Sequence, residues 1–152
     1  MLIKDLLDKG LTIHAAIRDP SKKDRLKYLQ DAADASPGSI KFFKADLLDE
    51  GSYLESIKGC QIVFHTASPF AMVVPKGKEQ EMLIDPAVKG TLNVLKSCAE
   101  VESVKRVVLT SSQVAVCVDP QESQDHVEKF GKCDERCWNT YASIDYMAYS
   151  VS

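Results

Sequence analysis

Hydroxyl side chains end one apolar stretch of the chain, and a phenol follows near the C-terminus. The stretch from Val104 to Ser112 is rich in branched residues and ends in Thr-Ser-Ser, and Tyr149 belongs to the final Tyr-Ser-Val-Ser. Such a run predicts a buried strand that delivers polar groups to the edge of a sheet. Ligands bind at that edge in doubly wound folds, and a phenol held in place can donate a proton to a reacting oxygen. We therefore take Ser112 and Tyr149 as a candidate catalytic pair.

Hydrophobic spacing and turn residues predict the elements that must position this pair. In chain order they are a helix from Leu2 to Lys9, a strand from Leu11 to Ile17, a helix capped by Ser21 that reaches Ala33, a strand from Ile40 to Lys44, a helix from Tyr53 to Lys58, a strand from Gln61 to Thr66, a helix from about Glu79 to Glu100, the Val104 strand, and the start of a helix from Tyr141 to Ser152. The Gln61 strand is nearly all apolar, as expected for a parallel strand covered on both faces. Strands alternating with helices predict a mostly parallel sheet with helices on both faces, in one domain over residues 1–152.

The sequence gives a less definite prediction for the local structure of two segments. Pro86 lies inside the long helical pattern, where it either occupies the first turn with Asp85 as the cap or kinks a longer helix. The polar segment from Asp119 to Asn139 lacks clear periodicity and is expected to be a long loop.

Composition excludes several classes of protein. The chain has 152 residues, of which 45% are hydrophobic and 27% charged, and its formal net charge is -3. A negative balance argues against a nucleic-acid-binding surface, which needs concentrated Lys and Arg. No apolar run approaches the roughly 18–20 residues that span a bilayer, and Lys4 and Asp5 interrupt any secretory segment. We expect a soluble, cytoplasmic protein that binds neither nucleic acid nor membrane.

The cysteines predict neither a disulfide framework nor a metal site. Their number is odd, no two stand in a Cys-x-x-Cys pair, and the three histidines do not lie at ligand spacing from them. Cys133 and Cys137 could share a helical face, but the charged residues between them are more typical of a solvated loop. We expect reduced, structural thiols and no metal ligand. The cysteines are Cys60, Cys98, Cys117, Cys133 and Cys137.

Five blocks in order resemble landmarks of one enzyme family. They are Ala16 to Pro20, Lys44 to Ser52, Val63 to Pro69, Asp85 to Leu95, and Thr110 to Ser112. These blocks are similar to those of the dihydroflavonol reductase and cinnamoyl-CoA reductase group of extended short-chain dehydrogenases, within the NAD-dependent epimerase/dehydratase superfamily. The resemblance implies an α/β fold, a partial doubly wound Rossmann-type sheet whose first strand is missing.

The resemblance also implies what lies outside these 152 residues. The family begins with a central strand and a Gly-rich turn that binds the cofactor pyrophosphate, and no such element precedes Leu2. The family's Tyr-x-x-x-Lys motif would place a lysine immediately after Ser152. We therefore interpret the chain as a fragment of a longer parent protein. The missing strand would lie between the Leu11 and Gln61 strands, so we expect unpaired edges, exposed apolar surface, low stability and no activity in the isolated chain.

By resemblance, Tyr149 donates the proton and Ser112 orients the substrate carbonyl. A lysine four residues after the tyrosine would lie on the same helical face and lower the pKa of the phenol. Ser111 competes with Ser112 for the place facing the cleft, and Tyr141 and Tyr146 are weaker competitors because no lysine follows them at that spacing. Without the resemblance, Ser112 would simply end a strand and Tyr149 would pack on the sheet.

The resemblance assigns the cofactor to the strand ends. Arg18 stands where NAD enzymes carry an acidic residue, and with Arg25 it suits a 2'-phosphate, so NADP (NADPH) is favoured over NAD. The alternative is that both are solvated surface arginines. Asp46 and Leu47 resemble the pair that holds adenine, although Asp46 could also cap a helix. Thr66, Ala67 and Ser68 would line the cofactor through backbone contacts. His65 is expected to be a packed histidine rather than a base, since strand alternation can point it away from the cleft.

Together these features predict an NADPH-dependent reductase of a small ketone or aldehyde. A sugar-nucleotide epimerase or dehydratase of the same superfamily shares the Tyr and Ser chemistry and is the first alternative. A non-catalytic relic or binding protein is the second. Cinnamoyl-CoA reductase in the narrow sense is disfavoured, because Tyr146 to Ser150 does not match its Asn-Trp-Tyr-Cys-Tyr-Gly-Lys pattern.

Overall fold

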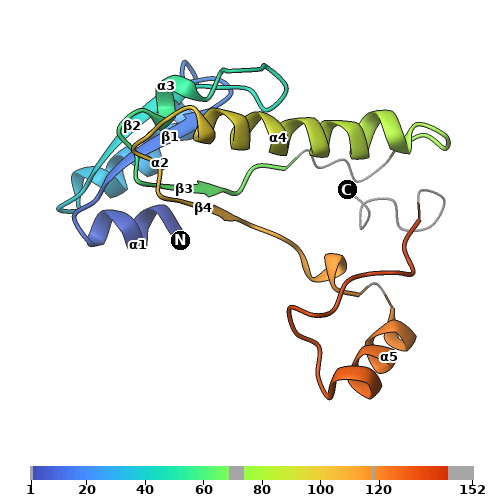
Figure 1. Cartoon of the computed structure of the whole chain (residues 1–152). Coiled ribbons are helices and arrows are strands. Elements are labelled where there is room, and N and C mark those ends of the chain that lie inside the picture. Colours follow the sequence, from blue (N-terminus) through green and yellow to red (C-terminus); the bar gives the residue numbers. More distant parts are fainter. Residues whose placement is uncertain (1, 69–73, 118, 144–152) are drawn as a thin grey trace. The chain divides into compact units, whose positions relative to one another are not determined.

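The computed structural model describes residues 2–68, 74–117 and 119–143 (Figure 1). Its elements are α1 (Leu2–Asp8), β1 (Thr12–Ile17), α2 (Lys23–Asp34), β2 (Ser39–Lys44), α3 (Leu54–Ile57), β3 (Ile62–His65), the π-helical η1 (Gln80–Ile84), α4 (Asp85–Ala99), β4 (Arg106–Leu109), the 3₁₀ turn η2 (Gln113–Ala115) and α5 (Pro120–Phe130). Contacts divide the chain into a first unit, residues 1–63 with 92–108, and a second unit, residues 64–91 with 109–152. The single domain expected from the sequence stays a prediction.

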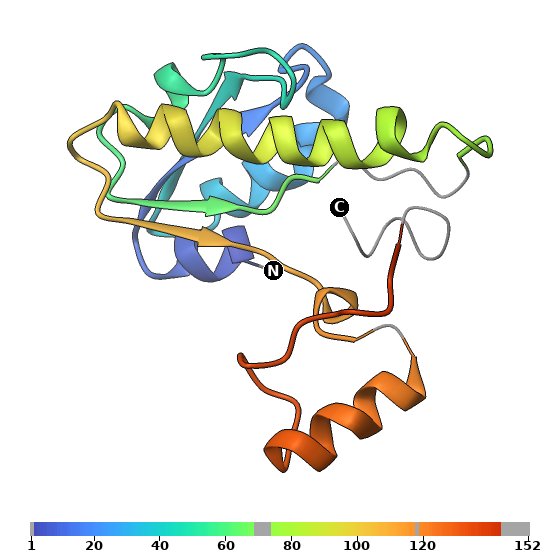
Figure 2. The ribbon, with the colours of Figure 1, turned by 45° about the vertical axis from the view of Figure 1, so that its right-hand side comes forward.

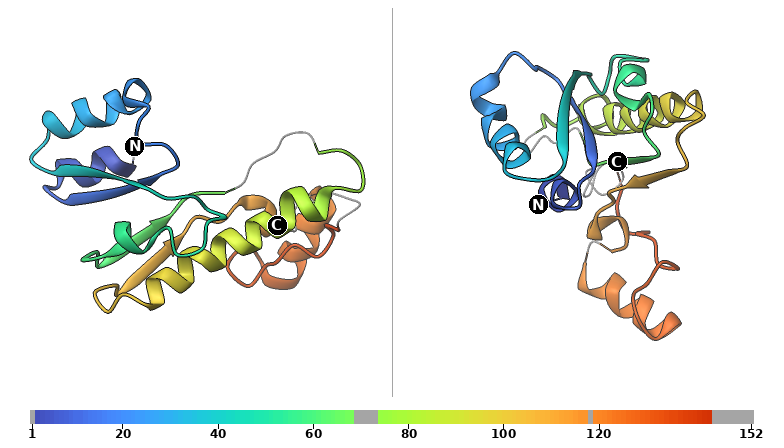
Figure 3. Two further views of the ribbon diagram at one scale, coloured as in Figure 1. Left: turned by 90° about the horizontal axis from the view of Figure 1, so that it is seen from above. Right: turned by 90° about the vertical axis from the view of Figure 1, so that its left-hand side faces the viewer.

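The strands β1 and β2 form a parallel pair in the first unit (Figure 3). Their register runs from Thr12 opposite Ser39 to Ile17 opposite Lys44, so both strands end at the same edge. Gly38 allows the turn before β2 to approach the end of α1 closely. Its N–H donates to the carbonyl of Leu7 at 3.0 Å, and a Cβ at this position would lie 2.7 Å from that oxygen. Only glycine fits here without moving the backbone.

The strands β3 and β4 form a second, separate pair. The amide of Lys105 donates to the Gln61 carbonyl at 2.8 Å, and the amide of Thr110 donates to the His65 carbonyl at 3.0 Å. Both strands therefore advance in the same direction, as in a parallel ladder. The four strands predicted from the sequence are all present, within a residue or two in most cases, but in the described residues they make two pairs rather than one continuous sheet.

Apolar side chains are exposed along the strands. Leu11 is 48% exposed, Ile62 52% and Leu109 51%. The expectation that the Gln61 strand is covered on both faces is therefore wrong, and the β4 strand is not buried either. The physical reason is that each sheet has two strands and too few neighbours to cover both of its faces. Exposed apolar surface beside an interrupted sheet was expected of a fold without its central strand.

The core of the first unit lies where α4 crosses the second strand pair. Ile57, Val94 and Cys98 are buried together, and Figure 2 shows the C-terminal half of α4 running alongside β3. The partly buried residues packed against this core are Leu47, Tyr53, Val63, Val101, Val104 and Val107. Apolar side chains of the long helix and of both strands thus converge on one cluster.

The long helix begins with a π-helical turn. The segment η1 ends at Ile84, and α4 starts at Asp85 with Pro86 in its first turn. The amide of Asp85 donates to the carbonyl of Gln80, five residues earlier. A proline cannot donate to the preceding turn and crowds the carbonyl four residues before it, and widening that turn relieves the conflict. Both interpretations of Pro86 therefore hold in part: it occupies a first turn, and it disturbs the helix that precedes it.

Two local predictions are wrong. Ser21 does not cap α2, whose N-cap is Lys22; the Ser21 hydroxyl instead donates to the Asp19 carboxylate at 2.6 Å, closing the turn after β1. The segment after Asp119 is not a loop throughout, because α5 occupies Pro120–Phe130. Its N-cap Asp119 accepts from the amide of Glu122 at 2.9 Å. Gly131 ends it in the left-handed conformation, with φ of 80°.

None of the helices in the described residues is long and apolar enough to cross a membrane. Residues 141–143 are not helical, and most of the helix expected from Tyr141 to Ser152 lies outside the described residues.

Candidate functional site

Arg18 and Asp46 meet at the carboxyl edge of the first strand pair. Ile17 and Lys44 are the last paired residues of β1 and β2, and the amide of Ala45 donates to the Ile17 carbonyl at 2.9 Å. Arg18, one residue beyond β1, and Asp46, two residues beyond β2, form an ion pair, with Arg18 Nε 3.3 Å from Asp46 Oδ2. The Arg18 side chain remains 83% exposed, so its charge stays accessible to a ligand. The arrangement places a cation and a carboxylate at the edge where parallel sheets bind ligands.

The loop after β2 holds Asp46 through short-range hydrogen bonds. The Asp46 amide donates to the Ser52 hydroxyl at 3.2 Å, and that hydroxyl donates to the Asp46 carbonyl at 2.8 Å. Asp46 Oδ1 accepts from the amide of Leu48 at 3.0 Å. Asp46 thus organises a turn and does not cap a helix, because α3 begins only at Leu54 with Tyr53 as its N-cap. Its other carboxylate oxygen pairs with Arg18.

Asn93 connects this loop to α4, and sequence reasoning gave it no role. Its amide nitrogen donates to the carbonyls of Leu47 at 3.1 Å and Asp49 at 2.8 Å, and its amide oxygen accepts from Gly51 at 3.0 Å. The side chain is only 6% exposed. Apolar spacing gave no signal for this role, because Asn93 lies opposite the stripe of Val88, Leu92 and Leu95 on the helix. As a buried amide it must find partners, and the loop supplies them.

The remaining residues assigned to the cofactor in this unit lie apart from the ion pair. Leu47 is half-buried, and its side chain packs against the core of the first unit. Arg25 lies exposed in the first turn of α2, and no contact between Arg25 and either Arg18 or Asp46 is found in the described part of the chain. The structure therefore brings Arg18 and Asp46 together, and it does not bring Arg25 to them.

In the second unit, two polar segments follow the paired strands. Thr66, Ala67 and Ser68 come directly after β3, and all three are exposed. Ser111 and Ser112 follow β4 and are also exposed, Ser112 with an extended backbone (φ −132°, ψ 153°). The bond from Thr110 to His65 joins the starts of the two segments, so they leave the sheet at one edge. Tyr149 lies outside the described residues.

His65 is a packed residue, as expected. It is 3% exposed, and its Nε2 is buried without a hydrogen-bond partner among the described residues. Burial lowers the pKa of this imidazole below 6.5, because the charged form would lose its hydration. A neutral ring with a buried nitrogen has no access to a substrate proton, which removes it as a candidate base.

This pKa shift predicts a loss of stability in mild acid. Above about pH 6.5 the ring is neutral in both the folded and the unfolded chain, so the free energy of unfolding is at its full value. As the pH falls towards the lower pKa of the folded state, the unfolded chain takes up a proton that the folded chain does not, and the free energy of unfolding declines. We expect His65→Leu to flatten the pH dependence of the free energy of unfolding between about pH 5 and 7. Urea unfolding at each pH measures this free energy. A steeper decline for the variant than for the parent would contradict the assignment.

A cavity of about 290 Å³ lies beside α5 in the second unit. Its lining residues are Glu122, Asp125, His126, Lys129, Phe130, Arg136, Trp138, Thr140 and Tyr141. The Tyr141 hydroxyl donates to Asp125 at 2.6 Å, and this hydrogen bond raises the pKa of the phenol. The Tyr141 hydroxyl therefore joins its loop to α5. This agrees with the expectation that Tyr141 is a weaker candidate than Tyr149 for the proton donor.

Comparison with known families matches residues 1–148 to the model of the 3-beta hydroxysteroid dehydrogenase/isomerase family. Among curated proteins, the chain is 49% identical over 115 residues to a cinnamoyl-CoA reductase of Medicago truncatula, a match covering 76% of this chain and 34% of that protein. It is 39% identical over 138 residues to a dihydroflavonol 4-reductase of Gerbera hybrida, covering 91% and 35%. The chain thus spans little more than a third of the length of the curated relatives it matches, as expected of a fragment.

Among solved structures, the chain resembles vestitone reductase from alfalfa (Medicago sativa). The TM-score is 0.57 at 27% identity, and the match covers 98% of this chain and 44% of that one. The α/β class, the parallel strands and the Rossmann-type architecture expected from the sequence are therefore confirmed.

Proposed function

Because the chain belongs to the 3-beta hydroxysteroid dehydrogenase/isomerase family, we propose that its parent protein is an NADPH-dependent reductase of a small ketone or aldehyde. The observation that carries the proposal is the pairing of Arg18 with Asp46 at the carboxyl edge of parallel strands, in a chain whose relatives are named reductases. A nicotinamide nucleotide is the cofactor that this family and these relatives imply. The preference for NADPH rests on the exposed guanidinium of Arg18.

The residues present fit part of such a cofactor. Arg18 would bind a 2'-phosphate through its guanidinium, and Asp46 would accept from the adenine amine. Thr66, Ala67 and Ser68 would contribute backbone groups beside the cofactor. The bound cofactor supplies a hydride to the carbonyl carbon.

Ser112 and Tyr149 complete the proposed chemistry. As hydride reaches the carbonyl carbon, negative charge develops on the carbonyl oxygen, and a donor must neutralise it. Ser112 would orient that oxygen by donating a hydrogen bond, and Tyr149 would transfer a proton to it. The exposed position of Ser112 after β4 supports this role, because its hydroxyl is accessible to a substrate.

The relatives favour a reductase over an epimerase, since the Medicago truncatula and Gerbera hybrida proteins both carry reductase names. The 49% identity to a cinnamoyl-CoA reductase keeps that chemistry among the candidates, although the Tyr146 to Ser150 pattern disfavours it. A cytoplasmic location remains part of the proposal.

The test uses an extended chain, in which the 152 residues are joined at both ends to the flanking segments of the Medicago truncatula relative. In this protein Arg18→Gln is expected to raise the Kd for NADPH about 10–100-fold and to leave the Kd for NADH nearly unchanged, because only NADPH carries the 2'-phosphate. Fluorescence titration with each nucleotide measures both constants.

The matched control is Lys27→Gln, which removes an exposed cation of α2 that pairs with Asp31. It should change neither constant. An equal loss for both nucleotides in Arg18→Gln, or no loss for NADPH, would overturn the preference for NADP.

A further inference from the structure

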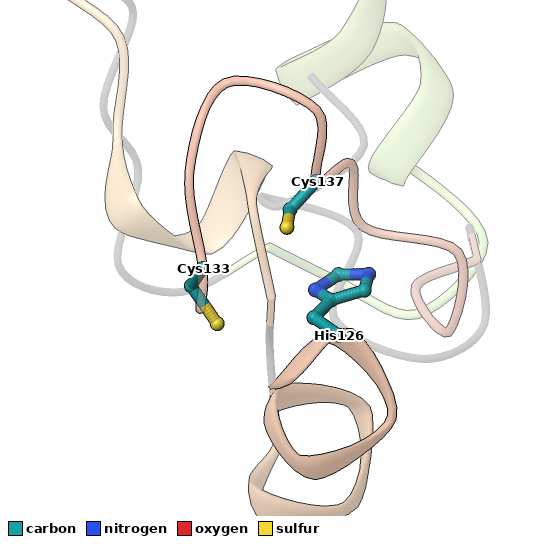
Figure 4. A group of neighbouring side chains, drawn as sticks. All are labelled: His126, Cys133 and Cys137. Carbon is teal, nitrogen blue, oxygen red and sulfur yellow. The ribbon is translucent and has the colours of Figure 1, made fainter. Parts of the chain in front are cut away.

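One imidazole and two thiols converge in the second unit. His126 lies on α5, and Cys133 and Cys137 lie in the loop that follows it. One ligand atom from each residue lies within 4.8 Å of the other two. Figure 4 shows both sulfur atoms on the same side of the imidazole ring. No metal ligand was expected here, because the histidines do not lie at ligand spacing from the cysteines, and the fold brings the three side chains together nonetheless.

The imidazole has an unsatisfied nitrogen in this cluster. His126 Nδ1 is buried, and it has no hydrogen-bond partner among the described residues. A buried polar atom without a partner costs free energy, so its persistence calls for an explanation such as a bound ion. Cys137 is 2% exposed while Cys133 is exposed, which leaves the cluster reachable from solvent.

Local hydrogen bonds fix the loop that carries Cys137 after α5. Gly131 turns the chain at the end of the helix. The Cys137 amide donates to the Asp134 carbonyl at 2.9 Å, and the Asp134 amide approaches Cys137 Sγ at 3.5 Å. Arg136 donates to the Asp134 carboxylate at 2.8 Å, which fixes the turn between the two cysteines.

We propose that His126, Cys133 and Cys137 bind one Zn²⁺ ion. Thiolate and imidazole are the ligands that Zn²⁺ prefers, and three protein ligands leave a fourth position for water. In a tetrahedral site the ligand atoms lie about 3.5–3.8 Å apart, so distances of up to 4.8 Å have to shorten by at most about 1.3 Å. Each thiol gives up its proton to solvent when the ion binds.

The proposed ion would fasten the loop to the helix. It would add to the bonds that the loop already makes to α5, in which Arg136 donates to the Phe130 carbonyl at 3.1 Å and Cys133 donates to the Ser123 carbonyl at 3.8 Å. His126 also lines the cavity beside α5, so metal binding would fix one wall of that cavity. This role is separate from the reductase chemistry proposed above and does not depend on it.

The test is a titration of the reduced, metal-free 152-residue chain with Co²⁺ under anaerobic conditions. We expect one equivalent to produce thiolate-to-cobalt charge-transfer absorption and the d–d bands of a tetrahedral site, and Zn²⁺ to displace it. X-ray absorption of the zinc form should show two sulfur neighbours at about 2.3 Å and nitrogen or oxygen neighbours at about 2.0–2.1 Å.

Variants separate this site from adventitious thiol binding. Cys133→Ser and Cys137→Ser should each weaken binding by about 100-fold or more, exceeding the usual effect of residues that only orient a ligand. Cys133 is exposed, so Cys133→Ser should fold. It therefore tests the site even if Cys137→Ser, which changes a buried residue, does not fold. The control Cys60→Ser, in the first unit, should bind normally.

Three results would overturn the proposal. They are an equal loss of binding in a control variant, a zinc spectrum without sulfur neighbours, and a disulfide between Cys133 and Cys137 that persists in the reduced preparation.

Discussion

Tyr149→Phe is expected to lower kcat of the extended chain by a factor of about 10²–10⁴, the usual contribution of a positioned proton donor. Phenylalanine keeps the aromatic ring and removes only the hydroxyl, so substrate and cofactor binding should change little. The reaction would then lack a group to neutralise the developing oxyanion. The measurement is NADPH oxidation with a panel of aldehydes and ketones, separating kcat from KM.

The competing hydroxyl residues supply the controls. Tyr141→Phe and Tyr146→Phe should retain most of kcat, and Ser112→Ala should reduce it more than Ser111→Ala. If Tyr141→Phe lost as much activity as Tyr149→Phe, the proton donor would have been assigned to the wrong tyrosine. The Tyr141 hydroxyl already donates to Asp125, which argues against that result.

The 152-residue chain alone should oxidise no NADPH. Its strands form two separate pairs, and apolar side chains such as Ile62 and Leu109 are exposed. The Gly-rich turn and the lysine of the family motif are not among its residues. Measurable oxidation of NADPH with any aldehyde or ketone by this chain would contradict the interpretation of the chain as a catalytically incomplete fragment.

Sequence patterns predicted the elements whose stability comes from periodic apolar burial. The spacing of Met82, Ile84, Val88, Leu92, Leu95 and Cys98 predicted the long helix. It did not predict the buried face correctly, because Met82, Val88, Leu92 and Leu95 are exposed, while Val94 is buried with Ile84 and Cys98. The order of strands and helices, together with the five family blocks, was enough to predict the parallel Rossmann-type class. Pairing between strands was harder to predict in detail, because it depends on the neighbours that each edge finds.

The helix α5 was missed because its buried face is partly polar. Glu122 is 1% exposed and accepts from the amides of Thr140 and Tyr141, so a carboxylate takes the place that an apolar residue has in a periodic pattern. Residues typical of a helix start and of a helix end were nevertheless present in the sequence. Asp119 with Pro120 marks a helix start, and Gly131 marks its end.

The clustering of His126 with Cys133 and Cys137 could not be predicted from spacing. It depends on where α5 ends and on the turn stabilised by Arg136 and Asp134, and neither feature follows from periodicity. Similarly, Arg18 and Asp46 are distant in sequence, and their pairing follows from the register of β1 with β2. The two residues could be proposed from the sequence as members of the cofactor site, but their contact could not.

Asn93→Leu is expected to lower the free energy of unfolding of the extended chain by roughly 3 kcal/mol or more, at about 1–3 kcal/mol for each of the three polar groups left unsatisfied. The leucine fills similar space but cannot bond to the carbonyls of Leu47 and Asp49 or to the amide of Gly51. Because these bonds hold the loop that carries Asp46, the Kd for NADPH should rise as well. Urea unfolding and nucleotide titration measure the two effects.

The matched control is Gln30→Leu, which removes an exposed amide of α2 bonded to Asp34 and should change stability by no more than about 0.5 kcal/mol. Asn93→Asp adds a sharper test, since it keeps an acceptor for Gly51 but turns a carboxylate towards two carbonyl oxygens. It should therefore also destabilise the fold at neutral pH. If Asn93→Leu matched the Gln30 control in stability and in NADPH affinity, the loop would be held by its local bonds, such as those between Asp46 and Ser52, and Asn93 would have no positioning role.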